Sequence, residues 1–184
     1  MTVPSWSEML PIFEGETNYM YLDDAGRVTA GVGHELLTSW NAVDLFGDPK
    51  AAEDWEAVKA MRPGLPASEY APATTVRLTQ AQINARKAQD IDIMADKLGT
   101  KHPNSSTWPA PARDVALDIL YNTGLIFFHM TAAMDARDWK TAATESLRKQ
   151  TPDENGKPVP GGIQKSRNDW ARDSILSLIP AVTA

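Results

Sequence analysis

The N-terminal part of the chain holds a pattern that strongly restricts its local fold: a short helix followed by a β-hairpin. Ser5 and Glu8 have the spacing of a capping box, and a glycine follows Glu14, as is common where helices end. Residues 19–32 are rich in β-branched and aromatic residues and glycine, and the Asp-Asp-Ala-Gly stretch at 23–26 suits a tight turn. We therefore expect a helix that ends near residue 14 and a hairpin over 19–32.

Most of the remaining chain has apolar residues at helical spacing. Pro11 lies inside the first helix, which predicts a short, distorted or late-starting helix because proline lacks an amide donor and clashes one turn back. Gly99 and Gly124 are expected to end helices, and Asp48 and Asp138 to cap them. The turn pair at 155–156 separates the last two. The predicted later helices cover residues 49–61, 79–98, 115–123, 138–147 and 166–178.

Composition describes an ordinary globular chain. Its 184 residues, 42% hydrophobic and 23% charged, fit one domain or two lobes that share a long helix. No apolar run is long enough to cross a bilayer, so we expect no membrane insertion, and the first ten residues do not resemble a signal peptide. We therefore expect synthesis in the cytoplasm. The net charge of −6 gives no long-range attraction for nucleic acid.

Cofactor chemistry has little support in the residues. The chain has no cysteine, which excludes disulfides and thiol catalysis, and its three histidines are widely spaced at positions 34, 102 and 129. We expect no metal site and no cofactor. Residues 62–75 hold several prolines and form a connection that is longer than usual, which indicates a lid, an insertion or a simple surface excursion.

The hairpin region carries residue types that suit glycosidic bond cleavage. This reaction needs one protonated carboxyl group as acid and a second group that orients water or stabilises positive charge. Glu14 lies at a helix C-terminus, where the helix dipole and partial burial disfavour the ionised form. Asp23 at the turn is more solvated, and Thr29 on the returning strand has a hydroxyl that can share a water with it.

The same residues have a purely structural interpretation. Glu14 can be a solvated residue at a helix end, Asp23 and Asp24 can be turn formers, and Thr29 can be an ordinary strand residue. Residue types alone favour this interpretation over catalysis. The order of the residues along the chain shifts the balance.

The ordered set Glu14-Gly15, Tyr21, Asp23, Gly26, Thr29, Gly31, Gly33 and His34 resembles the active-site segment of phage-type lysozymes. These are muramidases of glycoside hydrolase family 24, of which the lysozyme of T-even phages is the best-known member. The intervals between Glu14, Asp23 and Thr29 match the family pattern. Weaker similarity continues at residues 79–98, 121–124, 138–143 and 159–167, so that nearly the whole chain is covered in order.

The resemblance implies an α+β, mostly α, lysozyme-like fold with a small β-hairpin lobe and a larger helical lobe. It implies one lysozyme-like domain over 1–184: a small lobe of about 15–78 with an insertion at 37–78, an inter-lobe helix at 79–98, and a helical lobe of 1–14 and 99–184. The implied activity is that of a lysozyme, a bacteriolytic glycosidase. It hydrolyses, with inversion, the β-1,4 bond between N-acetylmuramic acid and N-acetylglucosamine in the peptidoglycan of the cell wall.

Roles follow residue by residue from the same resemblance. Glu14 would protonate the leaving oxygen, Asp23 would help activate or position water and stabilise positive charge, and Thr29 would hold that water. Tyr21 and Asn122 would contact the substrate. His34 is assigned to a structural ion pair with Asp90, in preference to a metal or catalytic role.

Departures from the family pattern raise further alternatives. The long segment between His34 and Thr79 carries Trp40, Trp55 and Tyr70, which can extend sugar binding, regulate access or simply pack. Basic residues that follow the glycine-rich segment are reduced to Lys165 and Arg167, so the cation that pairs with Glu14 is left open.

Two biological settings and two other function classes stay open at this stage. The sequence pI near 5.0 contrasts with the basic free enzymes of the family, so an injected antibacterial effector toxin is an alternative to a phage endolysin released through a holin. Either would act on the periplasmic wall. We expect a monomer that binds glycan strands, with an immunity or inhibitor protein as partner in the effector case. A non-catalytic peptidoglycan-binding or structural module is the main alternative function, and a nucleic-acid or small-molecule binding helical protein is the last.

Overall fold

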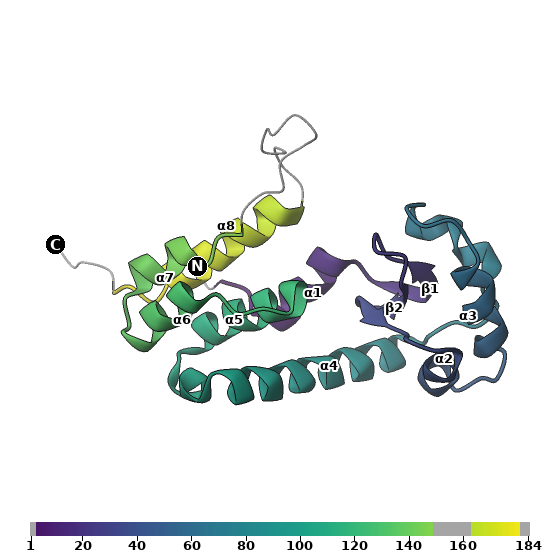
Figure 1. Cartoon of the computed structure of the whole chain (residues 1–184), viewed down its shortest axis with the longest axis horizontal. Coiled ribbons are helices and arrows are strands. Elements are labelled where there is room, and N and C mark those ends of the chain that lie inside the picture. The colour runs from purple at the N-terminus through teal and green to yellow at the C-terminus, as the bar shows by residue number, and fades with distance from the viewer. Residues whose placement is uncertain (1–2, 149–162, 181–184) are drawn as a thin grey trace. The chain divides into compact units, whose positions relative to one another are not determined.

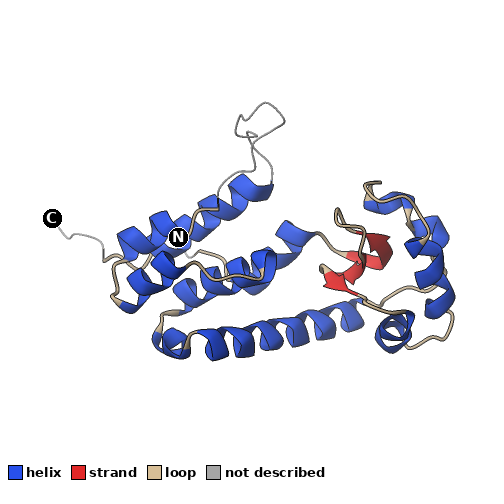
Figure 2. Cartoon of the chain, in the orientation of Figure 1, coloured by secondary structure: helices blue, strands red, loops and turns tan. Residues whose placement is uncertain are grey.

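The computed structural model describes residues 3–148 and 163–180, and these are mostly helical with one small antiparallel sheet (Figures 1 and 2). The expected α+β, mostly α class is thus observed. In chain order the elements are α1 (Trp6–Glu14), β1 (Thr17–Leu22), β2 (Val28–Gly31), β3 (His34–Glu35), α2 (Ser39–Phe46), α3 (Ala51–Lys59), η1 (Ala67–Glu69), η2 (Ala71–Ala73), α4 (Gln80–Lys101), η3 (Pro103–Thr107), α5 (Ala110–Thr123), α6 (Phe128–Asp135), α7 (Trp139–Glu145) and α8 (Ile163–Leu176).

The chain divides into two compact units, and each is described by itself. The sheet unit is Leu10–Asp92, and the helical unit is formed by Met1–Met9 together with Ile93–Ala184. Both divisions fall inside helices, the first inside α1 and the second inside α4. The predicted lobes, 15–78 on one side and 1–14 with 99–184 on the other, stay a prediction.

The predicted hairpin is the centre of the sheet unit. β1 and β2 are antiparallel, with Tyr21 opposite Thr29, and β3 continues the sheet along the other edge of β2. The turn closes with hydrogen bonds from the Asp23 amide to the Arg27 carbonyl (2.9 Å) and from the Gly26 amide to the Asp23 carbonyl (2.9 Å). Gly26 has φ +73°, a conformation that residues with a side chain rarely adopt.

Helix α1 is short, with nine residues, as predicted, and it does not start late. It begins at Trp6, and the Glu8 carboxylate accepts from the Ser5 amide at 2.8 Å, as in a capping box. The helix includes Pro11. Burial explains the tolerance: Trp6, Leu10 and Phe13 are at most 3% exposed, and this apolar stripe offsets the roughly 3 kcal/mol that an interior proline costs.

Residues 37–78 form a folded part of the sheet unit. Helix α2 was not predicted; Thr38 caps it, with its hydroxyl accepting from the Asn41 amide. Helix α3 confirms the helix predicted after Asp48, but the predicted cap is wrong. The helix begins at Ala51 after Lys50, and the Asp48 carboxylate accepts from the Lys50 amide at 2.9 Å instead of capping the helix. The proline-rich segment that follows is packed rather than loose, because its Tyr70 is fully buried and donates to the Arg62 carbonyl at 2.8 Å.

Helix α3 also anchors the end of that segment. The buried carboxylate of Asp54 accepts hydrogen bonds from the backbone amides of Thr75 (2.6 Å) and Val76 (2.9 Å). An acceptor inside the unit thus satisfies two amides that lie outside any strand or helix. The segment between α3 and α4 is therefore tied down at its C-terminal end.

Helix α4 begins at the capping box that the sequence predicts. The Thr79 amide donates to Gln82 Oε1 (2.9 Å), and the Gln82 amide donates to the Thr79 hydroxyl (3.2 Å). The predicted end at Gly99 is wrong, because the helix continues to Lys101. Glycine weakens a helix interior by about 1 kcal/mol relative to alanine but ends it only where the chain turns into the left-handed conformation, which Gly99 does not adopt.

In the helical unit, α5 is the most deeply buried helix. It ends at Gly124 with φ +69°, as predicted, and seven of its residues are buried. Helix α6 was not predicted. The predicted cap of α7 is confirmed, since Asp138 accepts from the Thr141 amide at 3.1 Å. Helix α7 contacts both α6 and α8, and α5 contacts α8. The predicted turn at 155–156 lies outside the described residues.

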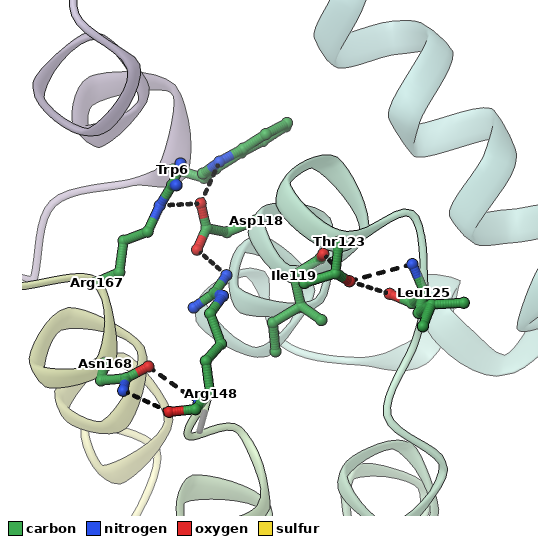
Figure 3. Close-up of polar contacts among 8 residues, drawn as sticks. All are labelled: Trp6, Asp118, Ile119, Thr123, Leu125, Arg148, Arg167 and Asn168. Carbon is green, nitrogen blue, oxygen red and sulfur yellow. Dashed lines mark hydrogen bonds and ion pairs between the residues drawn. The ribbon is translucent and has the colours of Figure 1, made fainter. Parts of the chain in front are cut away.

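A cluster of buried charged groups connects four segments of the helical unit (Figure 3). Asp118 on α5 has no exposed surface, and its carboxylate is ion-paired with Arg148 and lies 3.4 Å from Arg167 Nε. The Trp6 indole donates to the same carboxylate at 3.2 Å. Asn168 exchanges two 3.0 Å hydrogen bonds with the Arg148 backbone. The Asp118 carboxylate therefore pairs with both arginines and accepts a hydrogen bond from the first residue of α1.

Candidate functional site

The candidate site begins where α1 ends. Glu14 is the last residue of the helix and is half-buried, and Gly15 follows with φ +76°. This left-handed residue redirects the chain into β1, so Glu14 stands at the junction of helix and sheet. Its position at the helix C-terminus is the one that the sequence predicts.

The pKa of Tyr21 depends on the charged groups around this junction. The pKa of Tyr21 is raised to about 12, first by burial and then by the negative charges of Glu14, Asp23 and Asp24, in that order. Both candidate carboxylates therefore act on the same hydroxyl group. Since Thr29 is the direct cross-strand partner of Tyr21, the four predicted residues Glu14, Tyr21, Asp23 and Thr29 are brought into one neighbourhood of the sheet unit.

Asp23 is a structural part of the turn. One carboxylate oxygen, Oδ1, accepts from the amides of Ala25 (2.9 Å) and Arg27 (2.8 Å), and the other, Oδ2, accepts from Arg27 Nε (2.8 Å). The turn-forming role that the sequence allowed for this residue is thus observed. The carboxylate is also held rigidly, as a group that stabilises developing positive charge should be.

Thr29 is buried, and its hydroxyl donates to the Arg27 carbonyl at 3.1 Å. Because its one proton is used, the hydroxyl oxygen can interact with a water only as an acceptor. A water held in this way donates one hydrogen bond to Thr29. Its second hydrogen is then available to a base. The geometry is compatible with the water-holding role that the resemblance implies.

His34 and Asp90 are in contact, as the sequence predicts. His34 Nδ1 on β3 lies 3.1 Å from Asp90 Oδ2 on α4, and Arg86 Nη2 lies 2.6 Å from the other Asp90 oxygen. Burial alone would raise the pKa of Asp90, but hydrogen bonds and positive charge from His34 and Arg86 outweigh it and hold the pKa below its usual value. This ion pair connects β3 to α4 within the sheet unit.

Asp90→Asn is expected to reduce the free energy of unfolding at pH 7 by about 1.5–3 kcal/mol, the typical contribution of hydrogen bonds to a charged group. Because folding lowers the pKa of Asp90, its charged form stabilises the fold above the unfolded value of about 3.9. That contribution is lost as the pH falls through the folded value. The difference between wild type and variant in urea unfolding should therefore shrink as the pH falls below the unfolded value of about 3.9.

Asp92→Asn is the matched control, because Asp92 is exposed on the same helix. It should change the free energy of unfolding by less than about 0.5 kcal/mol at every pH. A loss in Asp90→Asn that is independent of pH would refute the charge-based explanation.

Other predicted residues lie apart from this neighbourhood. Asn122 is exposed in the last turn of α5 and belongs to the helical unit, so it is not brought together with Glu14 within one unit. Of the three aromatics proposed for sugar binding, access or packing, Tyr70 packs inside. Trp55 is half-buried and donates its indole to the Leu36 carbonyl at 2.9 Å, whereas Trp40 is 80% exposed.

Sequence reasoning missed Arg27 and Arg86, the basic partners of two predicted acids. Each is four residues from its aspartate, a spacing that brings side chains together on a helix, as in the Arg86–Asp90 pair. That spacing is a usable signal on α4. For Arg27 the turn itself determines the contact, and four-residue spacing carries no such meaning there.

Comparisons with known proteins give no assignment. No protein-family model matches the chain, and no curated protein matches it. Within residues 3–148 and 163–180, no cluster of three or more acidic or histidine side chains is arranged to hold a metal ion, and no helix is long and apolar enough to span a membrane.

Proposed function

We propose that this chain is a muramidase that hydrolyses the β-1,4 bond between N-acetylmuramic acid and N-acetylglucosamine in peptidoglycan. The observation that carries the proposal is that the negative charges of Glu14 and Asp23 both act on Tyr21, which lies directly across the hairpin from Thr29. Two carboxylates and a hydroxyl in one neighbourhood are the groups that glycosidic hydrolysis requires.

A lysozyme-like fold is part of the same proposal. A mostly helical chain with a small antiparallel hairpin sheet and a long helix, α4, shared by two compact units supports it. The sheet unit would be the small lobe, and the helical unit the large one.

In the proposed reaction, Glu14 donates its proton to the oxygen of the leaving sugar. Positive charge develops on the anomeric carbon, and Asp23 stabilises it and orients the attacking water, which Thr29 holds as an acceptor. As the water oxygen bonds to the anomeric carbon, its proton passes to the Asp23 carboxylate. Attack from the face opposite the leaving group inverts the anomeric configuration. Tyr21, whose proton is retained at working pH, contributes a hydroxyl donor to the substrate, and Asn122 is a further proposed contact.

The biological setting is also proposed. The chain would act on the bacterial wall as an endolysin after holin release, or as an effector injected into a rival cell. Neither role needs a cofactor. An effector would have an immunity protein as partner, and we propose that the enzyme itself works as a monomer.

A non-catalytic peptidoglycan-binding module is the second candidate. The specific observation in its favour is the ion pair between Arg27 and the Asp23 carboxylate. Such a pair would disable the catalytic site and leave the fold intact. The highly exposed Trp40 also suits sugar stacking.

Purified peptidoglycan distinguishes the two candidates. A muramidase should clear a suspension of walls and release soluble fragments, whereas a binding module should sediment with the walls and leave their turbidity unchanged. Sedimentation without clearing by correctly folded protein would refute the muramidase proposal.

A further inference from the structure

The Asp23 carboxylate carries a full set of hydrogen-bond donors. Two backbone amides contact Oδ1, and two guanidinium nitrogens of Arg27 contact Oδ2, Nε at 2.8 Å and Nη2 at 2.7 Å. A carboxylate offers about four acceptor positions. While Arg27 is in place, Asp23 therefore has no position left for a water, and the cation also compensates its negative charge.

Arg27 also binds a second acid at the same time. Its Nη1 donates to Glu35 Oε2 on β3 at 3.3 Å. The Arg27 side chain is 55% exposed, and exposed ion pairs contribute little to stability, so releasing Asp23 while the Glu35 contact is kept is energetically cheap. The hydrogen bond to Asp23 raises the pKa of the guanidinium, which stays charged in either position.

The carboxylate does not need Arg27 to stay in position. The amides of Ala25 and Arg27 hold Oδ1, and both belong to the hairpin turn that Gly26 closes. Moving the guanidinium away therefore frees Oδ2 and leaves the orientation of Asp23 unchanged.

We infer that Arg27 is a positioning residue that restrains Asp23: the carboxylate is masked while Arg27 bridges Asp23 and Glu35, and becomes competent when the guanidinium releases Asp23 and keeps only Glu35. This inference rests on the proposed muramidase function. Arg27 acts through Asp23 and contacts no reacting atom itself. Glu35 is the acceptor that holds the guanidinium when it is released from Asp23.

Arg27→Gln is expected to raise kcat for wall hydrolysis about two- to five-fold, the factor that corresponds to an exposed ion pair, with KM unchanged. Arg27→Lys keeps the charge and should stay near the wild-type rate. Arg62→Gln is the matched control, because it removes an exposed arginine of the same unit that makes no contact with Asp23. It should leave kcat unchanged.

Glu35→Gln removes the negative charge of the second acceptor, which weakens its hold on Arg27, and should lower kcat by a similar factor. In the double variant with Arg27→Gln, the Glu35 substitution should have no further effect on kcat. Glu35 acts only through Arg27, and the double variant has no Arg27 side chain. A purely structural role of Arg27 predicts no such dependence. Melting temperatures of all variants show whether the hairpin is intact.

The outcomes separate this inference from the function on which it rests. If Glu14→Gln is inactive while Arg27→Gln is unchanged or slower than wild type, the muramidase proposal stands and the restraint is refuted. Additive effects of the Arg27 and Glu35 substitutions refute it as well. If Glu14→Gln is as active as wild type, the proposed function fails and the inference fails with it.

Discussion

Glu14→Gln is expected to lower kcat for wall hydrolysis by about 10²- to 10⁴-fold, the usual contribution of a positioned general acid. Glutamine keeps the size and the hydrogen-bonding capacity of the side chain at the end of α1 but has no proton of suitable acidity to give to the leaving sugar. Binding to insoluble peptidoglycan should be retained. The measurement is the release of soluble fragments from purified walls, together with the circular dichroism spectrum of the variant.

Glu16→Gln is the matched control, two residues further along the chain. Glu16 is exposed, accepts a 3.1 Å hydrogen bond from Gln80, and belongs to the same sheet unit. It should retain wild-type activity, since the same charge is removed without loss of the acid. Equal losses in the two variants would indicate a general effect of charge and would contradict the role of Glu14.

Asp118→Ala is expected to cost about 3–5 kcal/mol in the free energy of unfolding, the largest stability effect that we predict. The substitution leaves Arg148 and Arg167 buried without the carboxylate that they share, and it removes the acceptor of the Trp6 indole (Figure 3). Buried cations are expensive when an anionic partner is lost. Urea unfolding followed by circular dichroism measures the loss.

Asp114→Ala serves as the comparison, one turn earlier on α5. Asp114 is half-buried and accepts from the Trp6 amide at 3.1 Å, and burial raises its pKa. Its replacement should cost no more than about 1 kcal/mol, as for one ordinary hydrogen bond. Similar losses in the two variants would mean that the charge cluster does not dominate the stability of this unit.

Local patterns predicted the hairpin and several helix ends for identifiable reasons. The turn at 23–26 depends on aspartate and glycine chemistry within a few residues, and the box at Thr79 and Gln82 is a contact between neighbours in sequence. Gly124 ends α5 because the chain there needs a left-handed residue. Each of these signals is contained in its own segment.

The helices that were missed lack such signals. Helix α2 is capped by Thr38 with Asn41 in place of the usual glutamate or glutamine, and α6 follows Phe127, which makes no side-chain cap. Burial of Met130 and Met134 in the helical unit accompanies α6, and burial is decided by distant residues. Tertiary contacts likewise allow α1 to include its proline and α4 to pass through its glycine.

The candidate site shows the same division. Glu14, Tyr21, Asp23 and Thr29 are close in sequence, so a helix end and a hairpin are enough to bring them together. The partners that modulate them were not predicted from residue types, because a charged residue in a turn is normally solvated. The three-dimensional structure is needed to show that Arg27 forms ion pairs with both Asp23 and Glu35.

Mass spectrometry of the fragments released from purified peptidoglycan tests the central claim most directly. We predict fragments that end in reducing N-acetylmuramic acid from the wild type, and none above background from Glu14→Gln. Such ends arise only when water attacks the anomeric carbon of the muramic acid. Fragments with 1,6-anhydro ends would contradict hydrolysis and the roles given to Asp23 and Thr29, and an absence of fragments from folded wild-type protein would contradict enzymatic function altogether.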